Sequence, residues 1–91
     1  MFEWDERKRR LNRDKHSVDF AEIEAFDWET ALTREDARDE YGERRFISVG
    51  RIGTRLHVCV WTVRDSTNRL ISLRKANPRE RKTYEQAQKL H

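Results

Sequence analysis

Three runs rich in β-branched and aromatic residues, separated by short turns, constrain the fold of this 91-residue chain more than any other feature. They cover Arg45–Gly50, Arg55–Val63 and Arg69–Lys75, and the expected turns are Arg51–Thr54 and Asp65–Asn68. Turns this short join antiparallel neighbours, so the runs predict a three-stranded antiparallel meander. The middle run has apolar side chains on both faces, which is typical of a central strand that is covered on both sides.

The segment before the meander carries a strand signal followed by two helix starts. Phe2–Trp4 alternates apolar and polar residues, and Asp5 is an N-cap residue for a helix that runs to about Lys15. Asp19 followed by Glu22 is close to a capping box and predicts a second, short helix. These helices are expected to cover the sheet.

A third helix is expected after the meander, because Asn77 precedes a proline at the first helical position. This helix should run to about Lys89. From Asp27 to Glu43 the pattern predicts an acidic loop, with a short extended piece at Thr30–Leu32. The predicted order is β-α-α-β-β-β-α, which is an α+β fold with a small antiparallel sheet, forming a single domain over residues 1–91.

Charge is divided unevenly along the chain. Residues 17–43 carry two Lys/Arg against ten Asp/Glu, whereas residues 44–91 carry twelve Lys/Arg against three Asp/Glu. This division favours a basic surface that binds RNA or another polyanion while the acidic stretch faces elsewhere. A basic half that is merely solvated is the alternative.

Several chemistries lack their sequence signatures. There is no glycine-rich phosphate loop, and the three histidines have no metal-ligand spacing, so neither a cofactor nor a metal is expected. Cys59 is the only cysteine, which excludes an internal disulfide and favours a reducing compartment. The longest apolar run is too short to cross a bilayer, and no signal peptide is evident, so a cytoplasmic location without membrane contact is expected.

Arginine, lysine and tyrosine are the remaining candidates for chemistry. Arg64 ends the middle strand, Arg74 and Lys75 end the last strand, and Arg81 and Tyr84 share one face of the final helix. Guanidinium groups bind phosphate and stabilise charge on a pentacovalent phosphorus, and the 2′-hydroxyl of RNA can itself be the nucleophile. This inventory suits RNA cleavage without a metal. The alternative is that these are ordinary surface residues.

The first helix has an unusual polar face. Lys8, Leu11, Asn12 and Lys15 are spaced so that they lie on one side of it. Because this face is only weakly apolar, we expect it to contact something polar, either a partner or a site.

An ordered set of motifs in this chain resembles the BrnT toxins of type II toxin–antitoxin systems. The first block is Phe2-Glu3-Trp4-Asp5, Lys8, Asn12, Lys15-His16, Val18, Phe20 and Glu22; the second is Glu43-Arg44-Arg45-Phe46-Ile47 and Gly50; the third is Thr62, Arg64, Arg69-Leu70-Ile71-Ser72, Arg74-Lys75-Ala76, Glu80-Arg81 and Tyr84. Two positions depart from the family pattern. Ser17 stands where glycine usually follows the histidine, and Leu73 replaces a smaller residue.

The resemblance implies a RelE-like fold and a ribonuclease toxin that arrests growth. It also implies a BrnA-like ribbon-helix-helix antitoxin, through which alone the toxin would reach operator DNA. The matched positions give the candidate site residues: Arg64, Arg74, Arg81, Tyr84 and His16 as catalytic residues, and Lys8, Lys15 and Lys75 as RNA-binding residues.

These residues lead to the hypothesis of a metal-independent endoribonuclease. Arg64 and Arg74 would hold the scissile phosphate, Arg81 would stabilise the transition state, and His16 or Tyr84 would carry protons. The hypothesis requires that the three arginines converge on one phosphate-sized opening. Two alternatives are a module that binds nucleic acid without cutting it and a protein whose basic face only docks an acidic antitoxin segment.

Overall fold

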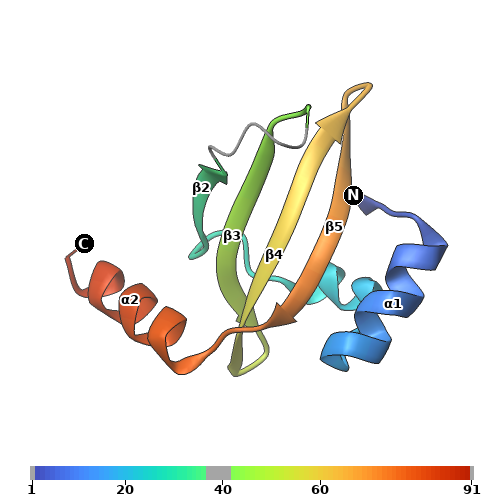
Figure 1. Cartoon of the computed structure of the whole chain (residues 1–91). Helices are drawn as coiled ribbons and strands as arrows, with labels where there is room; N and C mark the ends of the chain where they lie inside the picture. The colour runs from blue at the N-terminus through green and yellow to red at the C-terminus, as the bar shows by residue number, and fades with distance from the viewer. Residues whose placement is uncertain (1, 37–41, 91) are drawn as a thin grey trace.

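The computed structural model describes residues 2–36 and 42–90, which build one five-stranded sheet with helical segments before and after it (Figure 1). In chain order the elements are β1 (Phe2–Glu3), α1 (Glu6–His16), the 3₁₀ helix η1 (Phe20–Ala25), β2 (Leu32–Asp36), β3 (Arg45–Ile52), β4 (Arg55–Arg64), β5 (Thr67–Lys75) and α2 (Pro78–Lys89). The strands lie side by side in the order β1-β5-β4-β3-β2. The predicted α+β class is confirmed.

The antiparallel meander is the centre of the sheet, as predicted. β3 pairs with β4 through Arg45–Ile52 and Arg55–Thr62, and β4 pairs with β5. The strands extend further than the sequence indicated, because each turn needs only two residues. Gly53 (φ 62°) lies in the first turn, and Asp65 and Ser66 (φ 50° and 64°) form the second.

Two strands at the edges modify the predicted order. Leu32–Asp36, expected to be mostly loop, forms β2 and pairs antiparallel with β3. Its sequence alternates weakly and is rich in charge, so the strand is decided by pairing with β3. At the other edge β1 runs parallel to β5, which makes the sheet mixed instead of purely antiparallel. The rest of the predicted acidic loop, residues 37–41, lies outside the described residues.

One face of the sheet is covered by η1 and the segment before it. Phe20 of η1 packs with Cys59, Leu70 and Leu73, which are all fully buried. Burial raises the pKa of the Cys59 thiol to about 12, so this cysteine is an inert core residue. Leu73, expected to be a larger residue than usual at its position, is part of this core.

α1 packs along the edge of β5 through its polar face. The buried Asn12 amide donates to the carbonyls of Leu73 (2.7 Å) and Val18 (3.0 Å), and its oxygen accepts from the Leu73 amide (3.2 Å). β1 pairs with β5 only at Asn68 and Arg69, so the rest of this edge of β5 has no strand partner from β1. At Leu73 the Asn12 side chain supplies the hydrogen bonds that a neighbouring strand would otherwise make. The polar group that this face was expected to contact is thus the β5 backbone.

Candidate functional site

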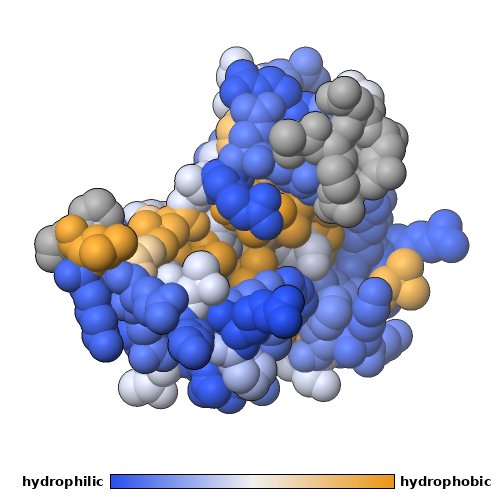
Figure 2. Space-filling model, turned by 60° about the vertical axis from the view of Figure 1, so that its left-hand side comes forward, coloured by the Kyte–Doolittle hydropathy of each residue, from blue (hydrophilic) through white to orange (hydrophobic). Residues whose placement is uncertain are grey.

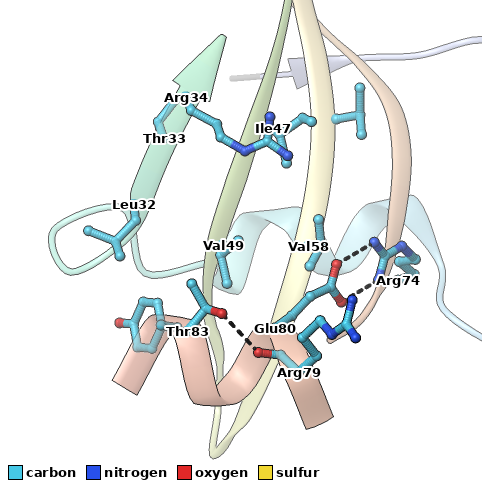
Figure 3. Close-up of a pocket in the computed structure, with 12 residues that line it drawn as sticks. Leu32, Thr33, Arg34, Ile47, Val49, Val58, Arg74, Arg79, Glu80 and Thr83 are labelled. Atoms are coloured by element: carbon cyan, nitrogen blue, oxygen red, sulfur yellow. Dashed lines mark hydrogen bonds and ion pairs between the residues drawn. The ribbon is translucent and has the colours of Figure 1, made fainter. Parts of the chain in front are cut away.

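The second face of the sheet is largely open. α2 follows the end of β5 and leaves a hollow of about 480 Å³ between itself and the strands. The hollow has an aliphatic floor and a charged rim (Figure 3), and in the space-filling view an apolar strip runs between hydrophilic side chains (Figure 2). The residues that line it are Leu32, Thr33, Arg34, Ile47, Val49, Val58, Val60, Arg74, Arg79, Glu80, Thr83 and Tyr84.

Tyr84 holds α2 in this position. Its ring is buried against Leu56 and Val58, and its hydroxyl donates to the carbonyl of Thr30 at 2.9 Å. Gln88, one turn further along the helix, donates to the same carbonyl at 3.1 Å. The tyrosine hydroxyl is therefore engaged in a tertiary contact, and this geometry favours an anchoring role over a proton-carrying one.

Arg74 is fixed at the rim by a bidentate ion pair with Glu80. The two nitrogen–oxygen distances are 2.8 and 2.7 Å, and the Glu80 carboxylate also accepts from the backbone N–H of Asn77, the N-cap of α2. This pairing lowers the pKa of Glu80 and raises that of Arg74. Within the described part of the chain, Nε–H and one Nη2–H of Arg74 have no acceptor, so they are available to a phosphate.

His16, the last residue of α1, lies close enough to Arg74 for the two charges to interact. Its pKa is lowered from 6.5, first by desolvation and then by the positive charges of Lys15 and Arg74. The imidazole is therefore neutral at pH 7, although it lies among cations. The docking of Asn12 on Leu73, the residue before Arg74, brings this end of the helix to the strand.

The candidate residues of α1 and β5 thus form one group. We name Lys15, His16, Arg74 and Lys75 the basic end of β5. Lys15 and Lys75 are exposed, and they directly adjoin the partly buried His16 and Arg74 in the sequence. Lys8 is exposed two turns before Lys15, on the same side of α1.

Arg64 lies far from this group. In the β4–β5 pairing Arg74 is opposite Val58, six residues before Arg64 on the same strand. At the rise of an extended strand this separation corresponds to about 20 Å. Arg64 instead forms a bidentate ion pair with Glu43, with both nitrogen–oxygen distances at 3.0 Å.

Arg81 is also separate from the hollow. It lies on α2 beside Lys82 and Glu85 and does not line the hollow, whereas Tyr84 does. The three arginines therefore do not converge on one opening, and that part of the hypothesis is wrong. Arg81 and Tyr84 are neighbours on the helix surface, as their spacing predicted. Tyr84 nevertheless lines the hollow, and Arg81 does not.

Part of the acidic stretch contacts the basic half and does not face elsewhere, as its charge had suggested. Glu35 pairs with Arg44 at 2.8 Å, and Glu43 pairs with Arg64 and with Arg45 at 3.0 and 3.5 Å. Acidic side chains of the middle segment thus neutralise part of the basic half. The pairing of β2 with β3 places Glu35 beside the start of β3 and so accounts for its contact with Arg44.

Two other kinds of site find no support in the described residues. Among them no three His, Cys, Asp or Glu side chains gather in a way that could hold a metal ion. None of the described helices has the length and apolar character needed to cross a membrane.

A comparison with known families supplies the identity. The sequence profile of the family described as ribonuclease toxin, BrnT, of type II toxin-antitoxin system matches residues 4–80.

The chain belongs to the BrnT family. The resemblance is thereby confirmed, and with it the class of ribonuclease toxins that have a cognate antitoxin. A search of curated proteins finds no significant match. Ser17, where the family resemblance led us to expect glycine, adopts a left-handed conformation (φ 58°). The serine therefore keeps the turn after His16 at some conformational cost.

Sequence reasoning missed several residues that line the hollow. Arg34 was missed because its segment was expected to be a loop. The available signal was its position two residues after Leu32, which would place both side chains on one face of a strand. Glu80 was noted as part of the third resemblance block, but its pairing with Arg74 carried no sequence signal. Arg79 was indistinguishable from other charged residues of α2.

Proposed function

We propose that this BrnT toxin is a metal-independent endoribonuclease whose reaction centre is the basic end of β5. The observation that supports it is an imidazole, His16, whose pKa is lowered in part by the positive charge of Arg74, a guanidinium that Glu80 holds in place. A base and a phosphate-binding cation are the two groups that cleavage by the 2′-hydroxyl requires.

The proposed reaction uses each group once. His16 accepts the proton of the 2′-hydroxyl, whose oxygen then attacks the adjacent phosphorus. Arg74 donates its remaining N–H groups to the phosphate oxygens and stabilises the charge that gathers there. The 5′-oxygen leaves and takes a proton from the imidazolium or from water, so the products carry a 2′,3′-cyclic phosphate and a 5′-hydroxyl.

Lysines would guide the RNA backbone toward this centre. Lys15 and Lys75 flank it, and Lys8 extends the positive charge along α1. Arg64 and Arg81 are not assigned to the reacting phosphate, because they lie elsewhere on the molecule. Contacts with more distant phosphates are the remaining role for them.

The proposal includes the biological setting implied by the family. Cleavage of RNA in the cytoplasm arrests growth, and a BrnA-like ribbon-helix-helix antitoxin binds the toxin and links it to operator DNA. A module that binds RNA without cutting it is the second candidate, supported by the basic surface alone. It would leave RNA intact while binding it with an affinity that falls steeply with salt.

The test uses purified protein and labelled single-stranded RNA in the presence of EDTA. Wild type should cleave and leave cyclic phosphate ends, and a 2′-deoxy substitution at the cleaved nucleotide should block the reaction. His16→Ala and Arg74→Ala should each lower the rate by about 100-fold or more. Arg10→Ala, an exposed position on α1, is the matched control. Cleavage that requires a metal, or full activity in both variants, would refute the proposed centre.

A further inference from the structure

The ion pairs of this toxin are distributed unevenly over the sheet. At the end where β4 stops and β5 begins, carboxylates hold the arginines. The pairs there are Arg44–Glu35, Arg64–Glu43 and Arg69–Glu3. At the opposite end, Arg51, Arg55 and Lys75 have no carboxylate partner within residues 2–36 and 42–90. A polyanion is therefore drawn to this second end more strongly than to the first.

The turn between β3 and β4 supplies two of these cations. Arg51 is the second-last residue of β3 and Arg55 is the first residue of β4, so the two flank the turn. Both side chains are exposed. Figure 1 shows the turn at the lower edge of the sheet, where β5 also ends and α2 follows. An RNA strand that crosses this edge would pass both arginines.

Strand register places Arg55 beside the proposed reaction centre. Lys75 lies opposite His57 in the β4–β5 pairing, and Arg55 is two residues before His57. Arg55 is thus the diagonal neighbour of Lys75 on the same face, with the Cα atoms about 7–8 Å apart. Two cations this close can bind successive phosphates of one strand, as in grooves that follow the backbone of single-stranded RNA.

Arg51 lies on the other face of the same turn. Its guanidinium is placed over the Tyr84 ring, 5.8 Å from the ring centroid, and this contact keeps it beside α2 on the open face. A carboxylate is near in the chain fold but is engaged elsewhere. Asp27 donates its N–H to the Arg51 carbonyl at 2.9 Å, while its side chain accepts from the amide of Glu29. The Arg51 guanidinium therefore keeps its positive charge uncompensated by an ion pair in the described part of the chain.

We infer that the β3–β4 turn is a second phosphate-binding site, in which Arg55 and Arg51 hold the RNA backbone beyond the scissile phosphate. This inference rests on the proposed function, since it adds the path of the substrate. The strand runs past Lys15 of α1, crosses the reaction centre and continues over the turn. Guanidinium groups bind phosphate oxygens in a bidentate fork, and phosphate contacts carry no base identity. The turn therefore adds affinity for any single-stranded RNA and no sequence preference.

Binding can be measured without cleavage in the His16→Ala background, with a labelled oligouridine of about ten nucleotides as the probe. Arg51→Gln combined with Arg55→Gln should weaken binding about tenfold. The slope of log affinity against log salt should become shallower by about 1.4, because each phosphate contact on a single strand contributes about 0.7. Arg10→Gln combined with Arg44→Gln is the matched control. It removes the same charge from exposed positions elsewhere and should change affinity by less than about twofold.

Cleavage in the otherwise wild-type toxin separates this site from the reaction centre. The Arg51 and Arg55 double variant should raise KM for the long RNA about tenfold and leave kcat within about twofold. A dinucleotide whose single phosphate is the scissile one does not reach the turn, so variant and parent should cleave it equally. Failure of the wild type to cleave any RNA would remove the proposed function, while the binding measurements would still decide the present inference.

Three results would overturn the inference. The double variant could bind the oligouridine with the affinity and salt slope of its parent. The control pair could lose as much affinity as the double variant, which would reduce the effect to net charge. The double variant could instead keep its affinity for RNA and lose affinity for a labelled oligoglutamate, which would make an acidic protein segment the ligand of the turn.

Discussion

Replacing Asn12 with alanine tests how the reaction centre is assembled. The change removes three hydrogen bonds and leaves the N–H and C=O of Leu73 and the C=O of Val18 without their partner in a buried site. Each such group costs about 1–3 kcal/mol, so the free energy of unfolding should fall by about 3 kcal/mol even if water enters the gap. A chain of this size has roughly 5–14 kcal/mol in total, so the variant should remain folded.

The assay is urea unfolding followed by the fluorescence of the three tryptophans. Asn68→Ala, which removes a partly buried amide of β5 without a side-chain hydrogen bond in the described residues, is the control and should change stability by less than about 0.5 kcal/mol. Cleavage of RNA by folded Asn12→Ala should also fall, because the end of α1 that carries His16 loses its attachment to β5. A loss of stability below about 1 kcal/mol, with an unchanged denaturant slope, would refute this account.

The other predictions concern the reaction centre and two backbone positions. Because desolvation and the positive charges of Lys15 and Arg74 lower the pKa of His16, the rate should decline toward acid pH with a midpoint below 6.5; a wild-type midpoint at or above 6.5 would contradict this. Ser17→Gly should raise the free energy of unfolding by about 1 kcal/mol in urea titrations, since it relieves the left-handed conformation. Gly50→Ala should lower it by about 1–3 kcal/mol, because a methyl group would lie 2.6 Å from the Phe26 ring; an unchanged midpoint would show that the ring yields.

Local signals in the sequence were sufficient where one segment decides its own structure. The N-cap residues Asp5 and Asn77 start α1 and α2 as predicted, because capping depends on neighbours within one turn. The β-branched runs likewise gave the meander. β2 was missed, since Leu32–Asp36 is a strand only in the presence of β3.

The sequence by itself determined the fold class, the BrnT family and the residue types available for phosphate chemistry, because these follow from local pattern and from composition. Only the tertiary structure decided which of those residues act together. Arg64, Arg74 and Arg81 look equivalent along the chain, yet strand register puts the first about 20 Å from the second, and the third does not line the hollow whose rim holds Arg74. The charge of Arg74 acts on His16 because Asn12 bonds to the backbone of Leu73, a contact between residues 61 positions apart that no local pattern encodes.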